Sequence, residues 1–244
     1  MRKFGLIGYP LTHSFSQRYF TEKFEREGIA GASYSVYPLR SIEELTALFG
    51  DPELRGLNVT IPYKEQVLPF LDDKNEIVRE INACNCIKIQ DGKKVGYNTD
   101  VVGFRESLLK KFQSHHTHAL ILGTGGAAKA VEYVIKKLGL SYRYVSRHPR
   151  PSTTDLSYEQ VDASLLRSHT LIINTTPLGM YPKIDECPAL PYEEIGPLHY
   201  LFDLVYNPSE TLFLQKGAAR GAVTENGYEM LIGQAEESWR IWNT

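Results

Sequence analysis

A buried β-type segment that runs directly into a glycine-rich turn is the feature that most restricts the fold of this chain. Residues 119–122 are all apolar, a glycine turn follows, and residues 127–138 have the pattern of a helix. In this G-x-G-x-x-A pattern Gly123 permits the tight turn, Gly125 lets the backbone approach a pyrophosphate, and Ala128 lets the helix pack closely on the strand. The order of strand, turn and helix therefore favours a dinucleotide-binding unit over an ordinary tight turn.

The rest of the chain alternates short β-type runs with longer helical ones. This alternation favours an α/β protein with a largely parallel sheet. Residues 15–27 have helical spacing, and an Asp-Gly pair predicts a hairpin between residues 84–90 and 93–97. Ser41 and Glu44 predict a capping box, in which the serine oxygen accepts from a first-turn amide and the glutamate side chain accepts from the backbone N–H of the serine.

The pattern predicts two lobes. Residues 1–100, completed by a last helix over 226–244, form an N-terminal α/β lobe that is expected to bind the substrate. Residues 101–225 form a Rossmann-like, doubly wound lobe that is expected to bind the nucleotide. We expect the active site between the lobes, and their closure over substrate is a hypothesis.

Composition excludes several kinds of partner. The 244 residues include 27 basic and 29 acidic side chains with a net charge of -2, which argues against a nucleic-acid partner. The sequence contains no stretch typical of a signal peptide or a membrane span, so a cytoplasmic protein, monomeric or homodimeric, is expected. His115, His116 and His118 crowd together without a nearby carboxylate or thiolate, and the three cysteines form no C-x-x-C pair, so no metal site is predicted.

The second β-type segment of the nucleotide unit, residues 142–145, bears on the choice between NAD and NADP. An acidic residue at its end would accept the 2′-hydroxyl of NAD, but Ser146, Arg147 and His148 follow instead. Arg147 can stack on adenine and donate to a 2′-phosphate, with Arg150 as a possible second cation. NADP is therefore predicted, and the alternative for Arg147 is a solvated surface arginine.

Polar side chains gather where β-type segments end. Asn58, Thr60 and Lys64 share one turn, and Asp100 follows another β-type segment. An ammonium and a carboxylate that converge on one cleft are typical of an active site. The alternative for Lys64 and Asp100 is a surface salt bridge, which contributes little stability.

These motifs together resemble the shikimate dehydrogenase family over nearly the whole chain. The resemblance is carried by His13-Ser14-Phe15-Ser16, Asn58-Val59-Thr60 with Pro62 and Lys64, Asn98-Thr99-Asp100, Gly123-Thr124-Gly125-Gly126-Ala127, Asn174-Thr175-Thr176-Pro177-Leu178-Gly179-Met180, and Gly227-Tyr228-Glu229-Met230-Leu231 before Gln234. The family reversibly reduces 3-dehydroshikimate to shikimate with NADPH, on the route to chorismate and the aromatic amino acids. The resemblance implies that activity for this chain.

The resemblance also implies roles for individual residues. Lys64 and Asp100 would be the catalytic pair, with the lysine stabilising charge on the carbonyl oxygen during hydride transfer. The implied substrate-binding residues are Ser14, Ser16, Asn58, Thr60, Asn85, Tyr206 and Gln234. The implied cofactor-binding residues are Gly123, Gly125, Gly126, Ala127, Arg147, Asn174, Thr175 and Gly227. For the two serines, a helix N-cap is the alternative role.

Several positions depart from the family pattern. Asn82 and Cys86 stand where glycine and threonine are usual, and Ser146 and His148 flank Arg147 where asparagine and threonine are usual. If His148 lies near the phosphate, NADP affinity should vary with pH around neutrality. The rival functions are a dehydrogenase that prefers quinate and a nucleotide-sensing protein of the same fold without turnover.

Overall fold

The computed structural model describes residues 1–11, 14–150 and 153–244, which form two compact units. Unit 1 comprises Met1–Thr99 and Ala235–Thr244, and unit 2 comprises Asp100–Gln234. Within the described ranges, none of the helices combines the length and the apolar character that a membrane crossing needs.

The last helix, α9 (Tyr228–Asn243), is shared between the two units. The sequence-based division instead kept all of residues 226–244 with the N-terminal lobe. The first part of α9 belongs to unit 2 because Gly103 packs directly on it. A Cβ atom at Gly103 would lie 2.3 Å from the Met230 carbonyl oxygen and 2.8 Å from the Gln234 backbone nitrogen, so only glycine allows this approach.

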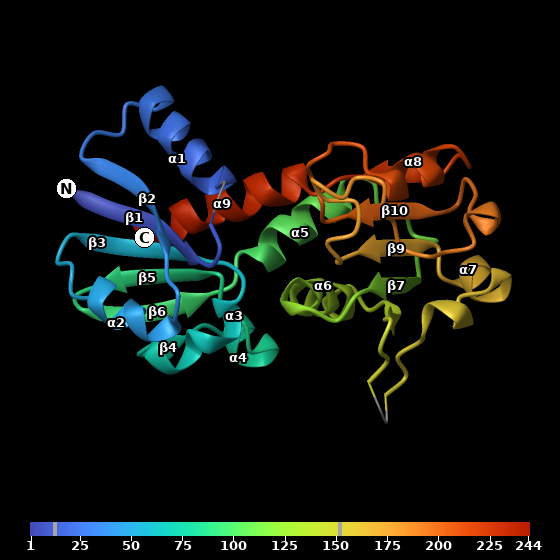
Figure 1. Cartoon of the computed structure of the whole chain (residues 1–244), viewed down its shortest axis with the longest axis horizontal. Helices are drawn as coiled ribbons and strands as arrows, with labels where there is room; N and C mark the ends of the chain where they lie inside the picture. Colours follow the sequence, from blue (N-terminus) through green and yellow to red (C-terminus); the bar gives the residue numbers. More distant parts are fainter. Residues whose placement is uncertain (12–13, 151–152) are drawn as a thin grey trace. The chain divides into compact units, whose positions relative to one another are not determined.

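Unit 1 is built on a six-stranded mixed sheet in the order β2-β1-β3-β5-β6-β4 (Figure 1). The strands are β1 (Arg2–Gly8), β2 (Ala32–Pro38), β3 (Leu54–Val59), β4 (Asp73–Lys74), β5 (Cys86–Gln90) and β6 (Lys93–Tyr97). Strand β1 pairs in parallel with β2 and β3, whereas β5 is antiparallel to β3 and β6. The predicted hairpin between β5 and β6 is confirmed, because Asp91 and Gly92 have φ values of 52° and 75°.

Helices cover both faces of this sheet and bury a separate apolar cluster on each. Helix α1 (Phe15–Arg26) and the end of α9 pack on one face, where Phe20 and Trp242 lie among buried aromatic rings. Helices α2 (Leu45–Leu48), α3 (Tyr63–Gln66) and α4 (Glu76–Ile81) contribute to the cluster on the other face. Burial of this apolar surface is the main term that stabilises the unit.

The predicted capping box at Ser41 is wrong. Ile42–Glu44 forms a short 3-10 helix (η1) before α2, and the Ser41 side chain caps no backbone amide. The hydroxyl instead hydrogen-bonds to the carboxylate of Glu43, which lowers the pKa of that group. The nearer carboxylate therefore takes the hydroxyl that the capping box would have used.

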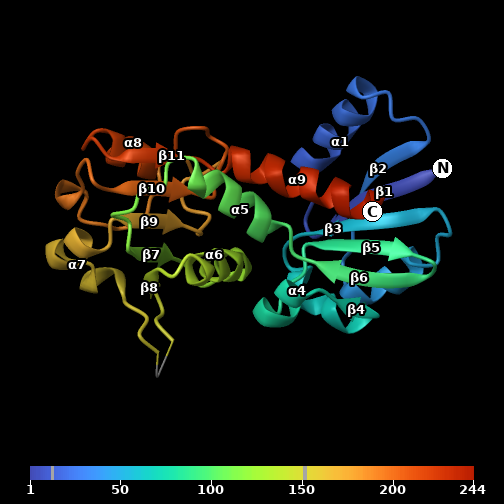
Figure 2. The same ribbon diagram turned by 180° about the vertical axis from the view of Figure 1, so that it is seen from behind.

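Unit 2 is built on five parallel strands in the order β11-β10-β9-β7-β8 (Figure 2). The strands are β7 (His118–Leu122), β8 (Ser141–Val145), β9 (Leu171–Asn174), β10 (Tyr200–Asp203) and β11 (Val223–Glu225). Helices α7 (Ala163–Ser168) and α8 (Leu212–Ala218) pack on one face. Helices α5 (Asp100–Leu109) and α6 (Gly126–Lys137) pack together, and Phe104 of α5 meets Phe202 edge-on at 5.1 Å. The predicted doubly wound architecture is confirmed.

Candidate active site

The turns after β7 and β9 meet at the point where the strand order of unit 2 reverses. Strand β8 pairs with one edge of β7 and β9 pairs with the other, and ligands of open α/β sheets bind beyond the carboxyl ends of the strands at such a point. Thr175 donates its backbone N–H and its hydroxyl to the Leu122 carbonyl oxygen, at 3.0 and 2.7 Å. A Cβ on Gly123 would lie 3.0 Å from Thr175 Oγ1, so the structure brings these two predicted cofactor residues together.

The glycine turn has the conformation and the open space that a pyrophosphate requires. Gly123 has a φ of 100°, in the left-handed region that favours glycine. At Gly125 and Gly126 a Cβ atom would meet nothing within 4 Å. Gly125 is also the N-cap of α6 and has no side chain to accept from the amides of the first turn, to which Ala127 belongs. Such amides, at the positive end of the helix dipole, fit a dinucleotide's phosphates.

Asn174 is held inside unit 2 by a buried carboxylate. Its Nδ2 donates to Asp203 Oδ1 at 2.9 Å, and its Oδ1 accepts from the N–H and hydroxyl of Thr176, at 3.1 and 2.6 Å. Asp203 is 0% exposed and also accepts from the Val205 N–H at 3.0 Å and the Thr211 hydroxyl at 2.5 Å. Burial raises the pKa of Asp203 to about 6, although these hydrogen bonds lower it in part. Sequence reasoning missed Asp203, and the available signal was a carboxylate that ends an apolar strand.

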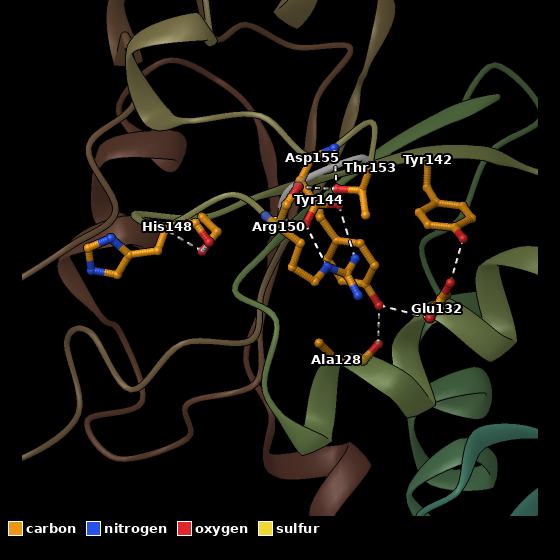
Figure 3. Close-up of polar contacts among 9 residues, drawn as sticks. Ala128, Glu132, Tyr142, Tyr144, His148, Arg150, Thr153 and Asp155 are labelled. Atoms are coloured by element: carbon orange, nitrogen blue, oxygen red, sulfur yellow. Dashed lines mark hydrogen bonds and ion pairs between the residues drawn. The ribbon is translucent and has the colours of Figure 1, made fainter.

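The loop after β8 contains the arginine predicted to select NADP. Arg147 is exposed, and so is His148, whose backbone N–H is bonded to Ser146 Oγ at 3.2 Å. Arg150, the possible second cation, is engaged in an ion pair with Asp155 (Figure 3). The two arginines of this loop therefore have different surroundings.

A chain of buried hydrogen bonds links predicted substrate-binding residues of unit 1. Asn58 accepts from the Tyr34 hydroxyl at 2.8 Å and donates to Ser238 Oγ at 2.9 Å. Thr99 Oγ1 lies 3.1 Å from Ser238 Oγ and 3.1 Å from Asn85 Nδ2, and the Thr99 N–H donates to Asn85 Oδ1 at 2.6 Å. All five residues are buried. The amide of Asn58 therefore joins β2, β3 and α9, and Asn85 extends the chain through Thr99. Sequence reasoning missed Tyr34 and Ser238 because no motif marks them.

The two predicted serines lie at the start of α1 and have different partners. Ser14 is the N-cap, since its Oγ accepts from the Gln17 N–H at 3.1 Å, as the alternative reading of the sequence proposed. Burial raises the pKa of Tyr34 well above its usual value, and a hydrogen bond from the Ser16 hydroxyl partly offsets this rise. Ser16 thus extends the buried chain, while His13 lies outside the described residues.

The predicted catalytic pair comes from two different units. Lys64 is half-buried in α3, and its carbonyl oxygen accepts from the Cys84 N–H at 2.8 Å. The backbone of Thr60, just before α3, is bonded both to β1 and to α3. Asp100 is 9% exposed and is the first residue of α5.

The remaining predicted residues lie around β10 and α9. Gln234 is buried, and its Nε2 donates to the Leu231 carbonyl oxygen at 2.8 Å. Tyr206 lies beyond the end of β10 and is 37% exposed. A Cβ on Gly227 would lie 2.1 Å from the Leu204 carbonyl oxygen, so close packing of the backbone explains this glycine.

The two departures near residue 84 leave the fold intact. Asn82 ends α4 with a φ of 53°, and asparagine tolerates this left-handed conformation better than most residues other than glycine. Cys86 is fully buried beside Ser238 and Trp242, and burial raises the pKa of its thiol. Cys86 therefore belongs to the core of unit 1.

The rings of His115 and His116 are bonded to the backbone, and that of His118 to the Thr117 hydroxyl. His116 is 2% exposed, and its Nδ1 accepts from the Gln113 N–H at 2.9 Å. Burial, with a contribution from His115, lowers the pKa of His116 to about 4. Among the residues that the structure describes, no group of three or more His, Cys, Asp or Glu side chains is placed to hold a metal ion.

The fold and the site define a two-unit α/β protein of the dinucleotide-binding class. Unit 2 supplies a parallel sheet with a glycine turn at its switch point, and unit 1 supplies a mixed sheet with a buried polar network. The family model described as the shikimate dehydrogenase substrate binding domain matches residues 6–87, which all lie in unit 1.

Known proteins resemble the chain along nearly its full length. It is 34% identical over 258 residues to shikimate dehydrogenase (NADP(+)) of Desulforamulus reducens, covering 98% of this chain and 88% of that protein. The structure of shikimate 5-dehydrogenase from Thermus thermophilus with NADP(H) and shikimate matches with a TM-score of 0.87 and 30% identity, over 99% and 93% of the two chains. Quinate dehydrogenase from Corynebacterium glutamicum with NAD matches with a TM-score of 0.88 and 25% identity, over 99% and 93%. The chain belongs to the shikimate dehydrogenase family.

Proposed function

We propose that this protein is an NADP-dependent shikimate dehydrogenase, which interconverts 3-dehydroshikimate and shikimate on the route to the aromatic amino acids. The observation that carries the proposal is the similarity to an NADP(+)-dependent shikimate dehydrogenase over 98% of the chain. A relationship of this extent spans both units and not merely the common nucleotide-binding fold.

The residues of unit 2 fit the cofactor. The amides at the start of α6 would hold the pyrophosphate, because Gly125 and Gly126 leave the approach open. The Arg147 guanidinium would bind the 2′-phosphate from its exposed position after β8. When bound, NADPH supplies the hydride that reduces the substrate carbonyl.

Lys64 and Asp100 carry the polar part of the reaction in this proposal. In the reduction the carbonyl carbon gains a hydride and the oxygen gains one proton to become the hydroxyl. The Nζ of Lys64 would donate a hydrogen bond to this oxygen as its negative charge grows. The Asp100 carboxylate would accept a hydrogen bond from the neighbouring substrate hydroxyl and so orient the substrate. Support for these roles comes from the burial of Asp100 and from the anchoring of the Lys64 backbone to Cys84.

The substrate hydroxyls and carboxylate would be held mainly by unit 1. Ser14, Ser16 and Thr60 are only partly buried, so each is open to solvent on one side. Asn58 and Asn85 lie behind them in the buried hydrogen-bond chain. A site of this kind favours a polyol, because an analogue without hydroxyls leaves polar groups unpaired.

A spectrophotometric assay with shikimate and quinate in parallel tests the proposal, because reduction of NADP+ changes its absorbance. We expect turnover of shikimate with NADP+. The similarity to a quinate dehydrogenase makes quinate the second candidate, and faster turnover of quinate would support it. Cofactor binding without turnover of either substrate would contradict both and indicate a sensor. A cytoplasmic location and a monomeric or homodimeric state stay predictions from the sequence.

A further inference from the structure

The two arginines of the loop after β8 are held in different ways. Arg150 forms a bidentate ion pair, with its Nε 2.7 Å from Asp155 Oδ2 and its Nη2 3.0 Å from Asp155 Oδ1. Arg147 is exposed, and within the described ranges it makes no ion pair. Only one of these guanidiniums is therefore available to an incoming anion without breaking an existing contact.

Further contacts fix the position of the Arg150 guanidinium. It lies 4.9 Å from the centre of the Tyr144 ring, whose hydroxyl donates to Glu132 Oε2 at 3.0 Å. Figure 3 shows Arg150 over this ring and against Asp155, with His148 lying away from them. Cation–π contact and ion pairing thus act on the same side chain.

Further hydrogen bonds among Arg150, Thr153 and Asp155 surround the ion pair. The Arg150 N–H donates to Asp155 Oδ2 at 3.3 Å, and the Thr153 hydroxyl donates to the Arg150 carbonyl oxygen at 2.9 Å. The Thr153 oxygen accepts in turn from the Asp155 N–H at 3.3 Å. The position of Asp155 is therefore determined by several contacts and not by the ion pair alone.

The carboxylate of Asp155 makes this pair difficult to break. Its side chain is only 3% exposed, whereas that of Arg150 is 53% exposed. The Arg150 guanidinium also lowers the pKa of Asp155, which keeps the carboxyl group ionised at neutral pH. If Arg150 turned toward a phosphate, a desolvated carboxylate would lose its counter-charge, which is strongly unfavourable.

We propose that Asp155 limits the preference of this enzyme for NADP over NAD by holding Arg150 away from the adenosine 2′-phosphate. The proposal rests on the proposed function, because it concerns the same nucleotide site. A 2′-phosphate carries between one and two negative charges, and the ion pair of Arg150 with Asp155 presents almost no net charge to it. Of the two arginines in this loop, Arg147 then supplies the discrimination.

Calorimetric titration of NADP+ and NAD+ into the intact protein tests this role without relying on turnover. Asp155→Asn keeps the shape of the side chain and removes its charge, which releases Arg150. We expect NADP+ to bind about 5- to 10-fold more tightly, the effect of one added charge-assisted hydrogen bond, with NAD+ changed less than about twofold. Arg147→Gln should weaken NADP+ by about 10-fold or more, whereas Arg150→Gln should change the NADP+/NAD+ affinity ratio by less than about twofold.

Two further variants separate the ion pair from general electrostatics. Glu159→Gln removes the same charge from an exposed position in the following 3-10 helix, and we expect it to leave the affinity ratio unchanged. In the double variant Arg150→Gln/Asp155→Asn the gain of Asp155→Asn should vanish, because no second guanidinium remains to be released.

The outcomes distinguish this role from its alternatives. An Arg150→Gln variant that loses NADP+ affinity as Arg147→Gln does would overturn the proposal, since Arg150 would then reach the phosphate. An equal gain in Glu159→Gln, or no gain in a folded Asp155→Asn variant, would overturn it too. If Asp155→Asn fails to fold, as judged by circular dichroism, the comparison of the two arginine variants decides. Wild-type protein that binds neither nucleotide would reject the proposed function itself, whereas normal wild-type binding with contrary variants rejects only the role of Asp155.

Discussion

Replacement of Asp203 by asparagine should remove a pH dependence from the stability of the protein. Asp203 is 0% exposed at the end of β10, and its two carboxylate oxygens accept from Asn174, Val205 and Thr211. Asparagine keeps Oδ1 as an acceptor for Asn174 and Val205, and its Nδ2 can donate to the Thr211 hydroxyl. The substitution therefore removes the buried charge while it retains the shape and the hydrogen bonds.

The magnitude follows from the difference between the folded and unfolded pKa values. The pKa of Asp203 is raised from 3.8 to about 6, so the folded state binds the proton more tightly than the unfolded state. The stabilisation from that proton is complete below the unfolded pKa and is lost as the pH rises through 6. By linkage, the wild-type protein should lose about 1.3 kcal/mol from this group between about pH 5 and pH 7, and Asp203→Asn should not.

Urea unfolding measured at several pH values tests this prediction. The difference in unfolding free energy between Asp203→Asn and the wild type should grow in favour of the variant from about pH 5 to pH 7 and stay constant above it. Circular dichroism of the folded baselines checks that both proteins start from the same structure. A difference that is independent of pH across this window would refute the reasoning, because Asp203 would then not titrate there.

Three further substitutions test other parts of the structure. His116 should affect stability with the opposite sign, because its lowered pKa of about 4 makes the unfolding free energy rise with pH between about 4 and 6.5. His116→Gln should remove about 2 kcal/mol of that rise between pH 5 and pH 7 in the same urea titrations. An unchanged slope would contradict this prediction. Asn58→Ala removes the acceptor of the buried Tyr34 hydroxyl and one of the partners of Ser238 Oγ, and should cost about 2–4 kcal/mol. The exposed control Asn243→Ala should stay within about 0.5 kcal/mol by thermal unfolding, and equal costs would refute the buried chain. Gly125→Ala should leave the melting temperature unchanged but weaken NADP+ binding by about 10-fold or more, since its Cβ would occupy only the open space proposed for the pyrophosphate. Gly196→Ala, which also places a Cβ in open space, is the control. Unaffected NADP+ binding in the Gly125 variant would argue against this role of the turn.

The local signals in the sequence were enough to predict much of the fold. The strand, glycine turn and helix from β7 to α6 occur where predicted, because each depends on residues that are close together in the chain. The Asp91-Gly92 hairpin is confirmed for the same reason. The prediction of a capping box at Ser41 was wrong because the serine hydroxyl bonds to the carboxylate of Glu43, one residue nearer than Glu44.

Contacts between segments that are distant in the chain could not be predicted from the sequence. Asn58 was singled out by its motif, but its partner Ser238 lies 180 residues away and has no motif of its own. Asp203 was missed because its role depends on the register of β9 beside β10. The pairing of Arg150 with Asp155 depends on the conformation of one loop, so the sequence indicated Arg150 only as a possible second cation for the 2′-phosphate.

The central claim is that Lys64 performs the polar chemistry of a shikimate dehydrogenase. The most direct test is the kcat for shikimate oxidation by the wild type and by Lys64→Met, together with the NADP+ dissociation constant of each. We predict a kcat lowered by roughly 10²-fold or more and an NADP+ affinity within about twofold of the wild type. A variant that turns over shikimate at the wild-type rate would contradict the account.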